Sequence, residues 1–226
     1  MFANAKVCGP SLLVSVNECE YTVSTIQDET VMITNTRPIV LASSSPRRRQ
    51  LLAESGVAFS VRAPTIAEPD EAFHGLSPSQ QAEALAYFKA RTIADDPRSE
   101  GLILGADTIV AVGEAVLGKP ADEADARRML GMLSGTRHQV VTGVALLDVG
   151  RGRLIASDVT HVRMKPLSPG DIDTYIATME WQGKAGAYAI QETADRYIES
   201  IEGSWSNVVG LPMELLARML QEIQHV

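Results

Sequence analysis

Two long β segments, residues 139–147 and 154–164, dominate the second half of the chain, and the turn sequence Gly150-Arg151-Gly152 lies between them. A glycine-containing turn between two such segments is typical of a β-hairpin, so we expect antiparallel strands here. In the first half, short apolar segments alternate with helical ones, as in parallel strands joined by helices. These apolar segments are residues 38–42, 57–63 and 102–110. The sequence therefore predicts an α/β (mixed α+β) fold with a mixed, twisted central sheet flanked by helices.

Capping residues mark the expected helices. Ser45 precedes Pro46 and Ser168 precedes Pro169, which is the pattern of a serine N-cap followed by proline at the first helical position. Gly56 is suited to end the first of these helices. Apolar residues also recur at helical spacing in three further segments, which are residues 79–94, 122–133 and 212–224.

The N-terminal segment differs from the rest of the chain because it has no sustained periodicity. We therefore expect an extension over residues 1–36, disordered or arising from a misassigned start, followed by one domain over residues 37–226. Met32 lies just before the change, and a natural start there is a hypothesis. An intact mass of the native protein that begins at Met1 would contradict it.

Composition narrows the classes of function. The net charge is −8 and the pI is about 5.0, which argues against nucleic-acid binding through general basic charge. No segment approaches the roughly 20 apolar residues of a membrane-spanning helix. Cys8 and Cys19 are the two cysteines, so a disulfide framework is not expected. The early apolar run is interrupted by Gly9 and Pro10, unlike a signal peptide. We expect a cytoplasmic protein with no nucleic-acid or membrane partner.

The segment Ser43-Ser44-Ser45-Pro46-Arg47-Arg48-Arg49 follows a strand and opens a helix. Free backbone N–H groups, hydroxyls and guanidinium groups at such a junction suit a polyphosphate. The alternative is a capped surface helix with solvated arginines. Cationic side chains oppose the dipole at a helix N-terminus, so three consecutive arginines there call for an anion.

Asp107 lies within an otherwise apolar strand, where an unpaired carboxylate is costly to bury. Its partner is either a metal or water, or else a buried arginine or backbone donors. Single-residue reasoning assigns Glu68, Lys89 and Lys119 to a solvated surface, and Gln191 either reads a base edge or caps a strand. His138 and His161 lack metal-ligand spacing, and no covalent nucleophile is evident.

Taken together, several segments in order resemble the Maf family of nucleoside triphosphate pyrophosphatases. They are Leu41-Ala42-Ser43-Ser44-Ser45-Pro46-Arg47-Arg48, Gly105-Ala106-Asp107-Thr108, Gly118-Lys119-Pro120, Leu133-Ser134-Gly135, Lys184-Ala185-Gly186-Ala187-Tyr188-Ala189-Ile190-Gln191 and Asn207-Val208-Val209-Gly210-Leu211-Pro212. The resemblance implies a Maf/ITPase-like fold with a nucleotide cleft between two lobes. It also implies hydrolysis between the α- and β-phosphates, a divalent Mg²⁺ or Mn²⁺ ion, and a homodimer.

The resemblance also implies a role for individual residues. Asp107 is the expected proton acceptor, and Glu68 with Asp107 is expected to hold the metal. Lys89 and Lys119 are expected to add catalytic positive charge. The expected substrate-binding residues are Ser43, Arg47, Arg48, Thr108 and Gln191.

Arg48, Thr108 and Gln191 resemble the branch of the family that acts on dTTP and UTP. Two alternatives stay open: a pyrophosphatase for 7-methyl-GTP or another modified nucleotide, and a nucleotide-binding regulator of septum formation. The carboxylates favour the enzyme, since a pure binder needs the arginines but not Asp107 with Glu68. One departure from the family pattern is the acidic segment 192–195, where the family often has glycines.

Overall fold

The computed structural model describes residues 31–33, 35, 37–65 and 75–225. These residues form a seven-stranded sheet in the order β2-β1-β3-β5-β6-β7, and β4 also pairs with β3. The strands are β1 (Ile39–Leu41), β2 (Phe59–Val61), β3 (Leu102–Val112), β4 (Ala115–Leu117), β5 (Arg137–Asp148), β6 (Gly152–Met164) and β7 (Ile198–Glu202).

The sheet is mixed, as predicted. β1 runs parallel to both β2 and β3, whereas β3, β5, β6 and β7 pair antiparallel to one another in turn. β5 and β6 form the expected hairpin, with Asp148 opposite Gly152 at the turn. The expected second strand, residues 57–63, is shorter in the structure, because only Phe59–Val61 pairs with β1.

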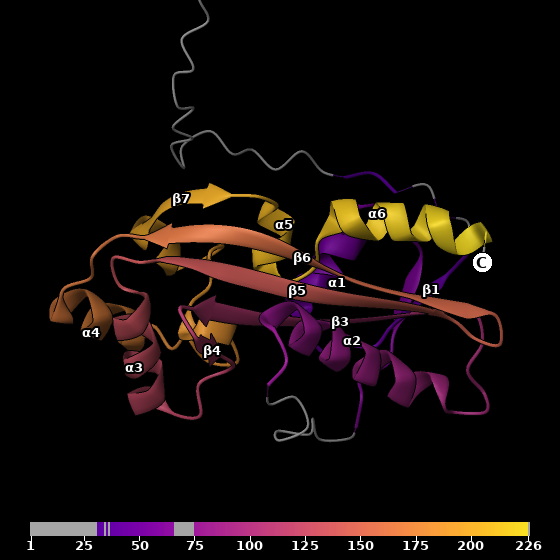
Figure 1. Cartoon of the computed structure of the whole chain (residues 1–226), viewed down its shortest axis with the longest axis horizontal. Helices are drawn as coiled ribbons and strands as arrows, with labels where there is room; N and C mark the ends of the chain where they lie inside the picture. The colour runs from indigo at the N-terminus through magenta and orange to yellow at the C-terminus, as the bar shows by residue number, and fades with distance from the viewer. Residues whose placement is uncertain (1–30, 34, 36, 66–74, 226) are drawn as a thin grey trace, which may run out of the picture.

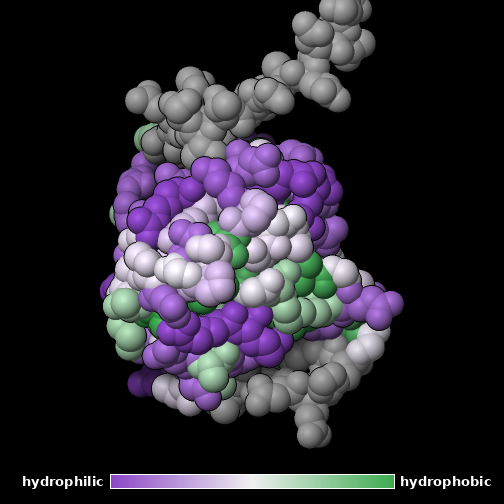
Figure 2. Space-filling view, turned by 90° about the vertical axis from the view of Figure 1, so that its left-hand side faces the viewer, coloured by the Kyte–Doolittle hydropathy of each residue, from purple (hydrophilic) through white to green (hydrophobic). Residues whose placement is uncertain are grey.

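Helices cover both faces of the sheet (Figure 1). On one face, α2 (Pro78–Ala94) packs against β3 and β5, while α5 (Trp205–Val209) and α6 (Met213–Glu222) pack against β5 and β6 on the other. α1 (Pro46–Glu54) contacts α5. α3 (Glu123–Leu133) and α4 (Pro169–Ala177) lie together near one end of the sheet. Figure 2 views that end, where small hydrophobic areas lie among hydrophilic residues.

The predicted caps are confirmed. The Ser45 hydroxyl accepts a hydrogen bond from the Arg48 amide, and Ser168 forms a reciprocal capping box with Asp171. α2 begins slightly before the predicted Ser79, because Ser77 forms a further capping box with Gln80. The final helix ends earlier than predicted, at Glu222, and a 3₁₀ turn over Ile223–His225 continues it.

Part of the predicted N-terminal extension lies among the described residues. Ile33 is buried in the core, and its amide donates a hydrogen bond to the Ser55 carbonyl. Residues 1–30, which include both cysteines, lie outside the described residues. In the part of the chain that the structure describes, no helix is long and apolar enough to cross a membrane.

Two glycines allow α2 to lie unusually close to the sheet. A Cβ atom on Gly105 of β3 would overlap the backbone of Ala86, and one on Gly143 of β5 would overlap that of Ala82. Both collisions are with helix backbone, which cannot move aside as a side-chain tip does. This close contact places Lys89 of α2 over β3.

Gly143→Ala is therefore expected to lower the free energy of unfolding by about 1–3 kcal/mol, because the added methyl group overpacks the helix–sheet interface. The measurement is urea unfolding followed by circular dichroism. Gly131→Ala is the matched control, since Gly131 lies exposed on α3 with open space around it. That substitution is expected to be neutral or stabilising by up to about 1 kcal/mol. Equal effects of the two substitutions would contradict the packing argument.

Candidate active site

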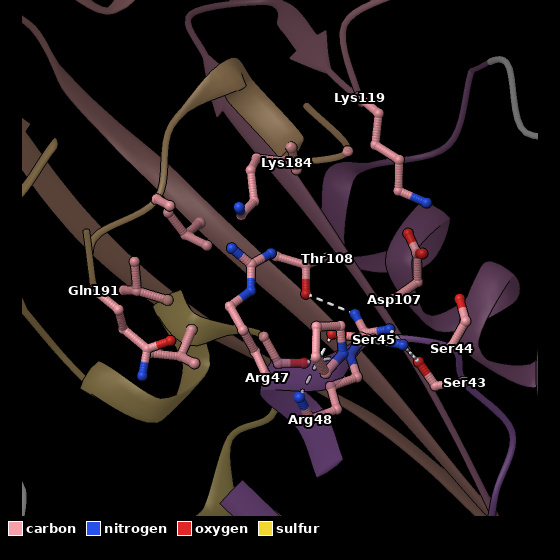
Figure 3. A pocket seen from close by; sticks show the side chains of 18 of the residues that line it. Ser43, Ser44, Ser45, Arg47, Arg48, Asp107, Thr108, Lys119, Lys184 and Gln191 are labelled. Atoms are coloured by element: carbon pink, nitrogen blue, oxygen red, sulfur yellow. Dashed lines mark hydrogen bonds between the residues drawn. The ribbon is translucent and has the colours of Figure 1, made fainter. Parts of the chain in front are cut away.

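A cavity of about 500 Å³ lies beside β3 (Figure 3). Its walls come from segments that are far apart in the sequence, so the fold creates it. The lining includes residues 42–48, Lys89, Asp107, Thr108, Lys119, residues 182–185, residues 188–192 and residues 208–210.

The cavity adjoins a stretch of β3 without a neighbouring strand on one side. β1 pairs with Leu102–Leu104, and β4 pairs with Val110–Val112. Among the described residues, no strand pairs with residues 105–109 on this edge. Asp107 and Thr108 lie in this gap, and successive side chains of a strand point to opposite faces. The open edge therefore exposes groups from both faces of the sheet to one cavity.

Asp107 forms an ion pair with Lys89 of α2. The exposed fractions of the two residues are 6% and 8%, so both charges are largely removed from water. The expected partners of Asp107 were a metal or water, or a buried arginine or backbone donors, and the structure provides Lys89 instead. The solvated-surface alternative for Lys89 is therefore wrong, while its expected catalytic role stays a prediction. Lys89 is instead the partner that makes the buried carboxylate tolerable.

Arg48 connects three parts of the cavity wall. Its Nε donates to the Gly210 carbonyl at 2.7 Å, its Nη2 to the Thr108 hydroxyl at 3.0 Å, and its Nη1 to the Ser43 hydroxyl at 3.3 Å. Arg48 is only 9% exposed, so the solvated-arginine interpretation is wrong for this residue. The guanidinium group fixes α1 against β3 and the start of the loop before α6.

Thr108 continues this network into the core. The Thr142 hydroxyl donates to the Asn207 carbonyl at 3.1 Å and lies 2.9 Å from the Thr108 hydroxyl. Because a threonine has one O–H, Thr108 must be the donor to Thr142. Thr108 also accepts a hydrogen bond from Arg48. Its O–H is already used, so Thr108 can contact a ligand only as a hydrogen-bond acceptor. Sequence reasoning missed Thr142, although a polar residue in an apolar strand was a usable signal.

Arg47 differs from its neighbour because it has no hydrogen-bond or ion-pair partner among the described residues. It is half-buried, and burial lowers the pKa of its guanidinium, an effect partly offset by the negative charge of Glu192. Lys119, just after β4, is exposed and lines the same cavity. Both cations are placed to meet an anion that enters from solvent.

The three serines at the start of α1 differ in their contacts. Ser45 caps the helix, while the buried Ser43 hydroxyl accepts from the Ser45 amide at 3.2 Å and from Arg48. The Ser43 O–H remains available as a donor to a ligand. Ser44 is exposed and also lines the cavity.

Gln191 lies on the opposite side of the cavity from Asp107 and Lys119 (Figure 3). Its side chain is exposed, as a group that reads a ligand requires. Sequence reasoning did not select Lys184, which lines the cavity near Arg47. The Lys184 ammonium donates to the Glu180 carbonyl at 3.1 Å and to the Glu192 carboxylate at 3.4 Å.

The predicted metal ligands fall partly outside the described residues, because Glu68 lies in the segment 66–74. Within the described ranges, no group of three or more His, Cys, Asp or Glu side chains is placed to hold a metal ion. The buried His138 is not part of such a group. Its Nε2 atom lies 2.8 Å from the Tyr188 hydroxyl, and burial lowers the pKa of the imidazole to about 4. Asp107 alone fits a Mg²⁺ ion that is bound largely by substrate phosphates, since Mg²⁺ commonly uses only one or two carboxylates.

The sequence of this chain is similar to a known protein family and to named relatives. The family described as Maf-like protein matches residues 38–223. A dTTP/UTP pyrophosphatase from Symbiobacterium thermophilum is 49% identical over 185 residues, which are 81% of this chain and 93% of that protein. Another from Geobacter sulfurreducens is 50% identical over 177 residues, 77% of this chain and 91% of that protein. A solved HAM1 protein from Coxiella burnetii has a TM-score of 0.48 at 19% identity, covering 82% of this chain and 98% of that chain. The family match contains every residue that lines the cavity.

Proposed function

The chain belongs to the Maf-like protein family, and from this premise we propose that it hydrolyses dTTP and UTP to the nucleoside monophosphate and pyrophosphate. The relatives named dTTP/UTP pyrophosphatase support this proposal, since they are about half identical over most of the chain. The observation that carries it is that Arg47, which forms no hydrogen bond or ion pair with the described residues, and the Asp107 carboxylate line one cavity. Such an enzyme clears nucleotides from the cellular pool.

In the proposed reaction, Asp107 accepts the proton of the attacking water. Its ion pair with Lys89 orients the carboxylate at the open edge of β3, in the wall of the cavity. Arg47 and Lys119 bind phosphate oxygens and offset their charge, and the Ser43 hydroxyl donates a further hydrogen bond. Phosphoryl transfer depends mainly on positioning and electrostatic stabilisation, so no covalent nucleophile is needed.

A divalent cation, Mg²⁺ or Mn²⁺, is the proposed cofactor. When bound, it would offset phosphate charge and lower the pKa of a bound water molecule. Asp107 is the described residue suited to hold it, and Glu68 is the proposed second ligand. An oxygen donor set of this kind suits a hard cation.

Pyrimidine recognition is proposed for Thr108 and Gln191. Thymine and uracil present a ring N–H flanked by two carbonyl groups. The remaining acceptor capacity of Thr108 suits the N–H, and the Gln191 amide suits a carbonyl. Arg48 would act by fixing Thr108.

Purified protein is expected to release pyrophosphate from dTTP and UTP faster than from 7-methyl-GTP, ATP or GTP. The assay couples pyrophosphate release to a colorimetric readout, with Mg²⁺ or Mn²⁺ present. Chelation with EDTA is expected to abolish release, and added Mg²⁺ to restore it. A preference for 7-methyl-GTP would contradict the substrate assignment, and activity unaffected by EDTA would contradict the metal assignment.

A cytoplasmic location and a homodimer complete the proposal. The scarcity of cysteines supports the first, and family membership supports the second. Light scattering of the purified protein measures the second directly.

A further inference from the structure

Two cations and one carboxylate meet at the side of the cavity formed by residues 182–192. Arg47 and Lys184 reach toward the same part of the cavity (Figure 3). Glu192 also lines this cavity, and its carboxylate pairs with the Lys184 ammonium at 3.4 Å. The charge of Glu192 acts on the Arg47 guanidinium as well. One carboxylate therefore partly neutralises both cations.

The backbone beside Glu192 is held in place. The next residue, Thr193, donates to the Glu180 carboxylate through its amide at 2.9 Å and its hydroxyl at 2.6 Å. The Glu180 carbonyl also accepts from Lys184. Glu180 thus holds Lys184 directly and holds Glu192 through the neighbouring Thr193. The fold itself therefore keeps Glu192 close to Lys184.

The pair itself is weak enough to be displaced. Its 3.4 Å separation exceeds the roughly 2.7–2.9 Å of a strong charge-assisted hydrogen bond. The Glu192 side chain is 38% exposed, so water competes for its charge. An incoming phosphate carries more negative charge than a carboxylate and can take its place at Lys184.

We propose that Glu192 is an affinity-setting residue, whose carboxylate is the resident counter-ion of Arg47 and Lys184 and competes there with the phosphate groups of nucleotide and product. This inference rests on the proposed function and adds Lys184 to the residues that bind phosphate. Glu192 weakens binding of the triphosphate, and it equally weakens retention of pyrophosphate, so product leaves the cavity readily.

Glu192→Gln is expected to lower KM for dTTP roughly three- to tenfold, because one charge is removed a few ångströms from the phosphate site. The inhibition constant of pyrophosphate should fall by a similar factor, while kcat stays equal or falls through slower product release. Asp195→Asn is the matched control. Asp195 is exposed on the same segment and does not line the cavity, so neither constant should change.

The Lys184→Gln variant tests whether Glu192 changes KM through its interaction with Lys184. In that background, adding Glu192→Gln is expected to lower KM by less than in the wild type, because one of the two cations is already absent. An unchanged or raised KM for Glu192→Gln would overturn the proposal, as would an equal effect of Asp195→Asn.

Calorimetric binding of magnesium pyrophosphate separates this inference from the proposed function. Tighter pyrophosphate binding by Glu192→Gln supports the inference even in a protein that fails to hydrolyse dTTP. Hydrolysis by the wild type with equal pyrophosphate binding by both proteins overturns the inference alone. A wild type that neither hydrolyses dTTP nor binds pyrophosphate overturns both.

Discussion

Asp107→Asn is expected to lower kcat for dTTP by a factor of about 10²–10⁴, because the amide cannot accept the proton of the attacking water. KM, measured at saturating Mg²⁺, should change little, since Arg47 and Lys119 remain to bind phosphate. Steady-state pyrophosphate release measures both constants. Turnover close to that of the wild type would remove Asp107 from the proposed reaction.

Stability must be separated from chemistry in this test, because Asp107→Asn removes the carboxylate that pairs with the buried Lys89 ammonium. Loss of one partner of a buried ion pair commonly costs about 3–5 kcal/mol. The double variant Asp107→Asn, Lys89→Met removes the ammonium as well as the carboxylate. It is expected to regain stability in urea unfolding and to remain inactive. Recovery of turnover together with stability would show that the single variant had failed through folding alone.

Arg47→Gln and Arg48→Gln are expected to act in different ways, although the two residues are adjacent. Arg47 forms no hydrogen bond or ion pair with the described residues, so its loss should leave the free energy of unfolding within about 0.5 kcal/mol of the wild type. Its loss should raise KM for dTTP by about 10- to 100-fold, since hydrogen bonds to charged groups contribute about 1.5–3 kcal/mol.

Arg48→Gln is expected to lower the free energy of unfolding by about 2–4 kcal/mol, because it removes the donors that connect Ser43, Thr108 and Gly210. Urea unfolding of both variants, beside KM for dTTP, gives the comparison. A destabilised Arg47→Gln protein with unchanged KM would contradict the assignment of Arg47 to the ligand.

Local features of the fold could be predicted from the sequence because each depends on a few neighbouring residues. The Ser-Pro caps at Ser45 and Ser168 and the hairpin turn at Gly150 are confirmed for this reason. The short helix α5 and the 3₁₀ turns within residues 185–197 were not predicted. These elements lack a long periodic pattern and are held by contacts with distant segments.

In the candidate site, too, features set by neighbouring residues could be predicted, and features set by distant residues could not. The phosphate-binding character of residues 43–48 could be predicted from hydroxyls and arginines at a helix start. The separate roles of Arg47 and Arg48 could not, because they depend on Gly210 and Thr108, which are distant in sequence. The pairing of Asp107 with Lys89 likewise depends on how closely α2 approaches β3, which two glycines allow.

The central claim is cleavage between the α- and β-phosphates of a pyrimidine nucleoside triphosphate. ³¹P NMR of dTTP incubated with the protein and Mg²⁺ tests it most directly, because it distinguishes every phosphorus product. The proposed function predicts dTMP and pyrophosphate in equal amounts. Accumulation of dTDP with inorganic phosphate, or unchanged dTTP, would contradict it.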